Sequence, residues 1–63
     1  MLRYLIEDKL SRYEIFHDQE RYIKEIEGYL KFAGFPGNEE RDIEFYIKNV
    51  ILPRVRRYDV ESR

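Results

Sequence analysis

The apolar residues between positions 15 and 33 recur at the spacing of a helix. Three series repeat every seven residues: Ile15, Tyr22 and Tyr29; Phe16, Ile23 and Leu30; and Gln19, Ile26 and Ala33. Because one face of an α-helix recurs about every 3.6 residues, these series predict a helix over about residues 19–33 with a wide apolar stripe. Gly34 is expected to end it in a left-handed conformation, with Phe35 covering Leu30 in a Schellman motif. Pro36 prevents the helix from resuming directly.

A second helix is predicted to begin after Asn38. Asparagine is a good N-cap, and the acids that follow it suit the positive end of a helix. An apolar stripe then continues the helical pattern through Ile43, Tyr46, Ile47, Val50 and Ile51. Pro53 lacks a backbone N–H, so we expect the helix to end or kink near Leu52. Whether a further turn covers residues 54–58 stays open at this point.

The first 17 residues allow more than one interpretation. Leu2, Ile6, Leu10 and Tyr13 have helical spacing, which favours a helix with or without a break. A break is suggested by a capping box from Ser11 to Glu14 inside a hydrophobic staple from Leu10 to Ile15, and Asp18 is a further candidate N-cap. Alternatively, residues 12–16 (RYEIF) form a short strand, since Tyr, Ile and Phe favour strands.

The pattern therefore predicts an all-α fold in one domain over residues 1–63. A helical hairpin and an N-terminal helix either close as a three-helix bundle or pair with a second copy as a dimeric helical bundle. We expect a flexible tail over residues 59–63. A chain of 63 residues buries only about 60% of its surface on folding, and with no cysteine it has no disulfide.

The composition argues against a membrane-spanning or secreted protein. No apolar run approaches the roughly 18 residues of a membrane span, and the start of the chain lacks a signal sequence, so a cytoplasmic location is expected. Charged residues make up 40% of the chain, yet the net charge is −1. Abundant Glu, Lys and Arg with few thermolabile residues resembles the composition of hyperthermophile proteins.

Catalysis is poorly supported by the residue types present. Apart from tyrosines, Ser11 and Ser62 are the only hydroxyl side chains, there is no thiol, and a single histidine must serve every role. No catalytic triad or glycine-rich phosphate loop can be assembled from these residues. We therefore expect no enzyme activity, no cofactor and no small-molecule substrate.

One spacing in the chain is typical of a metal site. Glu14 and His17 are three residues apart, as in the Glu-x-x-His pairs of di-metal helical bundles, and Glu40 or Glu44 would supply further carboxylates. Glu14 is better explained as the acid of a capping box, so no metal site is predicted.

Nucleic-acid binding is the alternative function. Residues 53–63 hold four arginines against two acids, and strand, helix, turn and helix in that order resemble a ribbon-helix-helix layout that would form a dimeric nucleic-acid-binding regulator. However, residues 18–44 hold eight acids against four bases. The second helix would open with carboxylates, which a polyanion repels.

The second helix is apolar on two sides, which points to a binding surface. At about 100° per residue, Phe45 and Leu52 lie opposite the main stripe, and a helix that is apolar on both sides must be covered on both. The N-terminal segment, a second copy or another protein has to cover the second side. We therefore predict a non-catalytic protein-binding adaptor, regulator or inhibitor that acts on a larger protein assembly or self-associates. The predicted partner-binding residues are Phe45, Leu52, Arg54, Arg56, Arg57 and Tyr58.

Overall fold

The computed structural model describes the backbone of residues 2–61 and the side chains of residues 2–56. The helical segments are α1 (Leu2–Arg12), α2 (Gln19–Ala33), α3 (Glu39–Tyr46), the π-helical turn η1 (Ile47–Ile51) and α4 (Leu52–Glu61). The predicted all-α fold is confirmed, and no strand occurs within residues 2–61. The strand interpretation of residues 12–16, and with it the ribbon-helix-helix layout, is therefore wrong.

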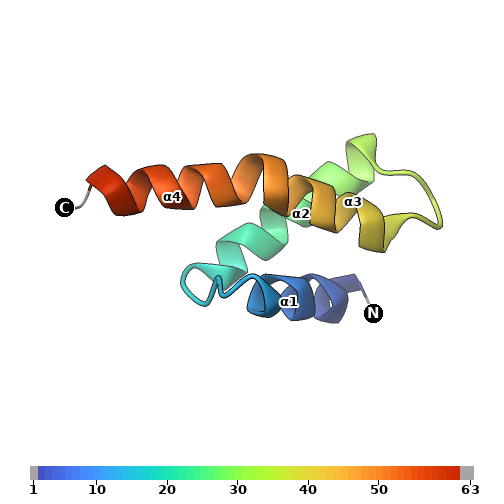
Figure 1. Cartoon of the computed structure of the whole chain (residues 1–63). Helices are drawn as coiled ribbons and strands as arrows, with labels where there is room; N and C mark the ends of the chain where they lie inside the picture. Colours follow the sequence, from blue (N-terminus) through green and yellow to red (C-terminus); the bar gives the residue numbers. More distant parts are fainter. Residues whose placement is uncertain (1, 62–63) are drawn as a thin grey trace.

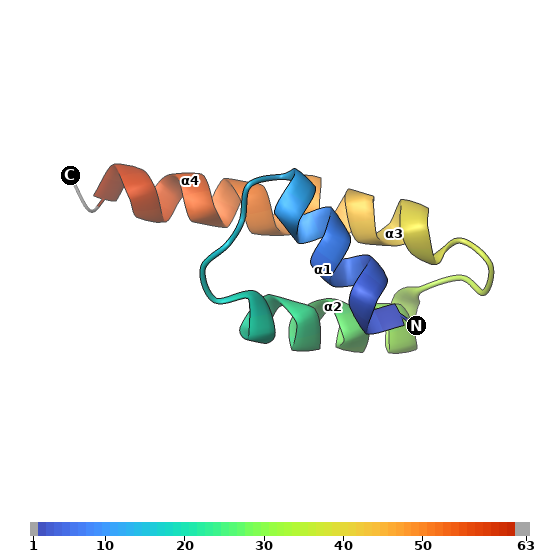
Figure 2. The ribbon, with the colours of Figure 1, turned by 90° about the horizontal axis from the view of Figure 1, so that it is seen from below.

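The helices form a hairpin with a third helix laid against it. Segments α2 and α3 run antiparallel, and α1 packs against both of them (Figure 2). Segments α3, η1 and α4 follow one another as a single long rod, which we call the rod (Figure 1). Its α4 half extends beyond α1 and α2, so the molecule is elongated, with extents of 40 × 19 × 16 Å.

Helix α1 ends in a Schellman motif centred on Glu14. Glu14 has a left-handed φ of 62°, and its N–H donates to the Ser11 carbonyl at 3.0 Å. The Ile15 N–H donates to the Leu10 carbonyl at 2.9 Å, and both of these side chains are buried. This is the hydrogen-bonding and apolar pairing of a helix C-terminus. The expected capping box and staple are wrong, because the Leu10–Ile15 pair ends one helix rather than beginning another.

Helix α2 begins at the second candidate cap. Asp18 occupies the N-cap position in a left-handed conformation (φ 52°), without a side-chain cap hydrogen bond. Its carbonyl accepts the Tyr22 N–H at 3.1 Å, and the Gln19 side-chain amide donates to the Ile15 carbonyl at 2.8 Å. The break between α1 and α2 thus spans residues 13–18 and is held at both ends by hydrogen bonds.

The end of α2 lies at the predicted residue, but its geometry differs from the prediction. Gly34 has φ −76° and ψ 157°, an extended conformation, and its N–H donates to the Leu30 carbonyl. A Cβ on Gly34 would lie 2.6 Å from that carbonyl oxygen, so close backbone approach rather than a left-handed φ favours glycine here. Phe35 is exposed instead of covering Leu30, and the left-handed glycine of the link is Gly37 (φ 87°).

The rod passes through Pro53 without ending. The Leu52 N–H donates to the Ile47 carbonyl, five residues back, which makes η1 a widened turn. This turn contains Asn49, whose carbonyl the Pro53 ring would otherwise meet. Pro53 therefore does not end the helix, because α4 continues to Glu61, and the irregularity near Leu52 is the wide turn η1 that precedes the proline.

Isoleucine builds the core. All seven isoleucines of the chain are at most 2% exposed, as is Leu10, and Tyr22 is buried with them at 7%. Ile43, Ile47 and Ile51 recur every four residues along the rod, and each is 0% exposed. A regular α-helix would rotate such a series progressively away from the core, and the wide turn η1 offsets that rotation.

Within residues 2–61 no helix has the length and apolar character needed to cross a bilayer.

Candidate protein-binding surface

All four phenylalanines of the chain lie on the surface. Their exposed fractions are 66% for Phe16, 86% for Phe32, 68% for Phe35 and 58% for Phe45. Phenylalanine is among the residues most often buried, and leaving one exposed forgoes roughly 1.5–3 kcal/mol of burial. The helical pattern places Phe16 in the same stripe as Ile23, yet in the fold every phenylalanine is exposed and every isoleucine is buried.

The predicted partner-binding residues do not share one face. Phe45 is exposed, whereas Leu52 is half-buried and packs against the core. Arg54 donates to the Glu25 carboxylate at 3.0 Å, and Arg56 is exposed. The side chains of Arg57 and Tyr58 lie outside the described residues. Counting 100° per residue fails because η1 places about one extra residue in its turn and thereby rotates Leu52 away from Phe45.

Phe45 instead lies among cations on the outer face of the rod, which we define by Arg41, Phe45, Lys48 and Asn49. Arg41 precedes Phe45 by four residues and Lys48 follows it by three, so both are its neighbours on the helix surface. The Asn49 side chain donates to the Phe45 carbonyl at 2.8 Å. Both cations are exposed, and neither forms an ion pair within residues 2–56.

The carboxylates of α3 accept hydrogen bonds from groups elsewhere in the same chain. Glu40 and Glu44 accept hydrogen bonds from the Lys9 ammonium, at 2.9 Å and 2.6 Å. Asp42 accepts the Phe35 N–H at 3.0 Å, and Glu39 accepts the Gly37 N–H at 3.3 Å. Counting acids along the sequence could not reveal this orientation. Glu44 nevertheless lies near both cations of the outer face: it lines a shallow hollow with Arg41, and the charge of Lys48 adds to the Lys9 hydrogen bond in lowering its pKa.

Lys9, which is itself nearly buried, joins α1 to the rod by pairing with two acids of α3. The residue is 3% exposed, whereas the side chains of Glu40 and Glu44 are 67% and 40% exposed. Hydrogen bonds to Glu44 and then to Glu40 raise the pKa of Lys9 above its ordinary value. The hydrogen bond from Lys9 lowers the pKa of Glu44 in turn. The two acids considered as additional metal ligands therefore serve to neutralise a lysine.

The Glu14 and His17 spacing does not form a metal-binding pair. Both residues lie in the connection between α1 and α2, and Glu14 is left-handed, so the two do not share a helical face. Within the part of the chain that the structure describes, no three His, Cys, Asp or Glu side chains are grouped to hold a metal ion.

A second polar cluster joins α2 to the rod around Glu25. The Tyr46 hydroxyl donates to its carboxylate at 2.5 Å, and the Tyr46 ring meets that of Tyr29 edge-on at 4.7 Å between centroids. Burial, the hydrogen bond to Glu25 and the negative charge of Glu25 raise the pKa of Tyr46 to about 12. Burial alone would raise the pKa of Glu25, but hydrogen bonds from Tyr46 and Arg54 outweigh it and lower that pKa. Arg54 is therefore a structural residue of this cluster.

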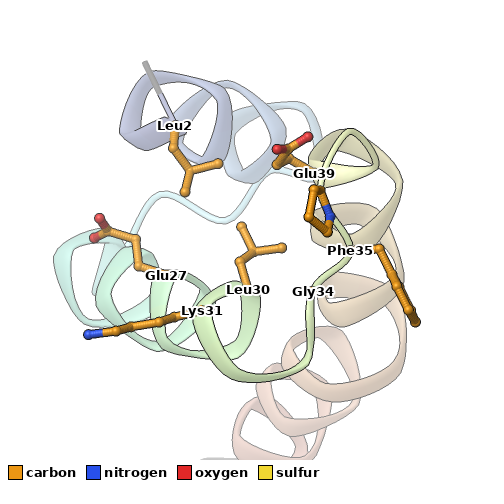
Figure 3. A pocket seen from close by; sticks show the side chains of 8 residues that line it. Leu2, Glu27, Leu30, Lys31, Gly34, Phe35 and Glu39 are labelled. Carbon is orange, nitrogen blue, oxygen red and sulfur yellow. The ribbon is translucent and has the colours of Figure 1, made fainter.

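An open hollow lies where α1 begins, α2 ends and the link to α3 passes (Figure 3). It has a volume of about 360 Å³ and is lined by Leu2, Glu27, Leu30, Lys31, Gly34, Phe35, Pro36 and Glu39. The Leu2 and Leu30 side chains point toward one another across it, whereas the Phe35 ring points away (Figure 3). This lining suits contact with an apolar side chain of another molecule.

No family model, curated protein or solved structure matches the chain. Its function is therefore inferred from the chemistry of the exposed residues.

Proposed function

We propose that the protein is a cytoplasmic, non-catalytic protein-binding module that acts as an adaptor, regulator or inhibitor of a larger protein assembly. The observation that carries this proposal is the exposure of all four phenylalanines around a core already closed by isoleucine. Four exposed rings forgo on the order of 6–12 kcal/mol of burial, which is comparable with the whole stability of a small domain. Association with another chain would recover part of that free energy.

The size of the surface supports association. The chain exposes 4940 Å², whereas a compact protein of its mass exposes about 4,400 Å². A standard interface buries about 800 Å² on each partner. The excess of about 500 Å², which includes part of the exposed rings, is more than half of the area that a standard interface covers on one partner.

Phe45 is the best-placed anchor for a partner. It lies on the rod, where the helical backbone fixes the direction of its ring, and two cations and an amide surround it. Aromatic and arginine side chains are enriched among the residues that dominate binding energies at interfaces. A rigid aromatic ring within a polar rim is the usual composition of such a site.

Affinity capture from the source organism tests the proposal. Wild-type protein and the Phe45→Ala variant are immobilised at equal density, with Lys24→Ala as a control because Lys24 is an exposed residue of α2. We expect a protein that is retained stoichiometrically by the wild type and by the Lys24 variant but lost from the Phe45 variant. Identical proteins on all three surfaces would contradict the proposal.

A further inference from the structure

We infer that the outer face of the rod binds an acidic segment of another protein. In this arrangement carboxylates of the partner pair with Arg41 and Lys48 while one of its apolar side chains covers Phe45. The inference rests on the proposed function and adds the chemistry of the partner to it.

Charge complementarity is the first step. The α3 acids are hydrogen-bonded to Lys9 and to backbone N–H groups, as described above, whereas Arg41 and Lys48 form no ion pair within residues 2–56. The two cations lie on either side of an exposed aromatic ring. Acidic side chains at matching spacing satisfy both cations, and complementary charge selects such a partner over neutral ones.

A second copy of this chain fits the outer face poorly. In an interface between two identical faces related by a two-fold axis, each residue i faces a residue j of the other copy and j faces i, and only residues on the axis meet their own equivalents. With Phe45 at the centre, the positive charges of Arg41 and Lys48 would then face those of the other copy. Like charges across an interface cost several kcal/mol, so the two-fold pairing is repelled where the acidic segment is attracted.

A nucleic acid also fits the face less well than a short acidic segment. Duplex DNA carries about one negative charge per 1.7 Å along its axis, so it cannot avoid the acidic first turn of α3 at one end of the rod. That turn contains the three acids Glu39, Glu40 and Asp42. A peptide segment that covers only the stretch from Arg41 to Lys48 avoids most of this repulsion.

Photo-crosslinking from position 45 tests the inference. The full-length protein is prepared with benzoylphenylalanine in place of Phe45, irradiated in a lysate of the source organism, and the crosslinked peptide is sequenced by mass spectrometry. We expect a partner segment that carries several Asp or Glu residues next to an apolar one. The Arg41→Glu, Lys48→Glu double change should reduce crosslinking about tenfold or more. The matched control, Arg21→Glu with Lys24→Glu on α2, alters net charge equally and should leave crosslinking unchanged.

The outcomes separate the inference from the proposed function. If position 45 captures no protein, the proposed function fails and the inference with it. If it captures a protein through a segment without acids, or if the charge reversal has no effect, the inference fails alone. Capture of a second copy, or a crosslink removed by nuclease, likewise overturns the inference. Should the reversed variant unfold, Arg41→Gln with Lys48→Gln removes the same charges without introducing repulsion, and unchanged crosslinking by that variant contradicts the inference.

Discussion

Leu10 and Ile15 pack together in the core on either side of the residue that ends α1. The Ile15 N–H donates to the Leu10 carbonyl at 2.9 Å, and the side chains are 2% and 0% exposed for Ile15 and Leu10. Glu14 between them has a φ of 62°, a region that disfavours residues with a Cβ. The apolar contact therefore holds a non-glycine residue in the position where glycine is preferred.

Replacing Glu14 with glycine should stabilise the protein. The left-handed conformation costs a residue with a Cβ roughly 1–2 kcal/mol, part of which is offset by the greater freedom of glycine in the unfolded chain. We expect the free energy of unfolding to rise by about 0.5–1 kcal/mol in urea denaturation. Lys24→Gly, within α2, should lower it by a similar amount because glycine weakens a helix interior. A Glu14 variant less stable than wild type would contradict the left-handed turn.

The same region shows what a sequence pattern can predict. Apolar periodicity located α2 from Gln19 to Ala33, because burial of one face imposes that period, and the capping preference of Asn38 located the start of α3. It also paired Leu10 with Ile15, but two apolar residues around a break fit a helix start and a helix end equally well. Only the backbone hydrogen bonds decide between the two.

The candidate surface was less accessible to sequence analysis, for two physical reasons. A pattern that counts apolar residues treats Phe45 and Ile47 alike, although one is exposed and the other buried. The wide turn η1 changes the angle per residue, so Leu52 could not be placed on the correct face by assuming a regular helix. The signal for that turn was present in Pro53 and in the four-residue spacing of the rod isoleucines.

Lys9 should govern part of the loss of stability in acid. Since its hydrogen bond lowers the pKa of Glu44 in the folded state, this pair stabilises the protein above the ordinary carboxyl pKa of about 4.3 and loses its effect as pH falls through the lowered value. In Lys9→Met the hydrogen bond to Glu44 is lost, and the pKa of Glu44 returns toward its ordinary value. We expect a shallower decline in melting temperature below pH 4.3.

The control for Lys9 is Arg12→Met. Arg12 pairs with Asp8 at 3.1 Å, but both side chains are more than half exposed, so the pair contributes little. Its acid profile should match that of the wild type. If the two variants show the same profile, Lys9 does not hold Glu44 in solution.

Tyr46 should govern part of the loss of stability in alkali. Its folded pKa of about 12 exceeds the ordinary value of 10, so its contribution is present below pH 10 and is lost as pH rises through about 12. Tyr46→Phe removes one hydrogen bond to Glu25, while the hydrogen bond from Arg54 remains. The change should lower the free energy of unfolding by about 1–2 kcal/mol at pH 7. The loss of stability at alkaline pH should then be shallower than in the wild type. The control is Tyr4→Phe, at a residue 65% exposed, which should change neither the free energy of unfolding at pH 7 nor the alkaline loss.

Pro53 should be replaceable without loss of the wide turn. Proline is about 3 kcal/mol less favourable than alanine inside a helix, and Pro53 is exposed. The buried series Ile43, Ile47 and Ile51 requires η1 whether or not the proline follows it. We therefore expect Pro53→Ala to be more stable by about 1 kcal/mol or more, with the Leu52 N–H still protected from hydrogen exchange. Conversion of η1 to a regular turn, seen as altered nuclear Overhauser contacts of Ile51, would show that proline alone imposes it.

Phe45 and Ile47 should respond oppositely to truncation although they are two residues apart. Phe45 is 58% exposed, so Phe45→Ala should change the free energy of unfolding by no more than about 0.5 kcal/mol. Ile47 is 0% exposed, and Ile47→Ala should cost about 2–5 kcal/mol because it leaves a cavity in the core. Leu52→Ala should lie between the two, since Leu52 is half-buried against the core. Urea denaturation of the three variants measures this order directly. A large loss for Phe45→Ala would place its ring in the core, and the outer face would then lack the aromatic anchor on which partner binding depends.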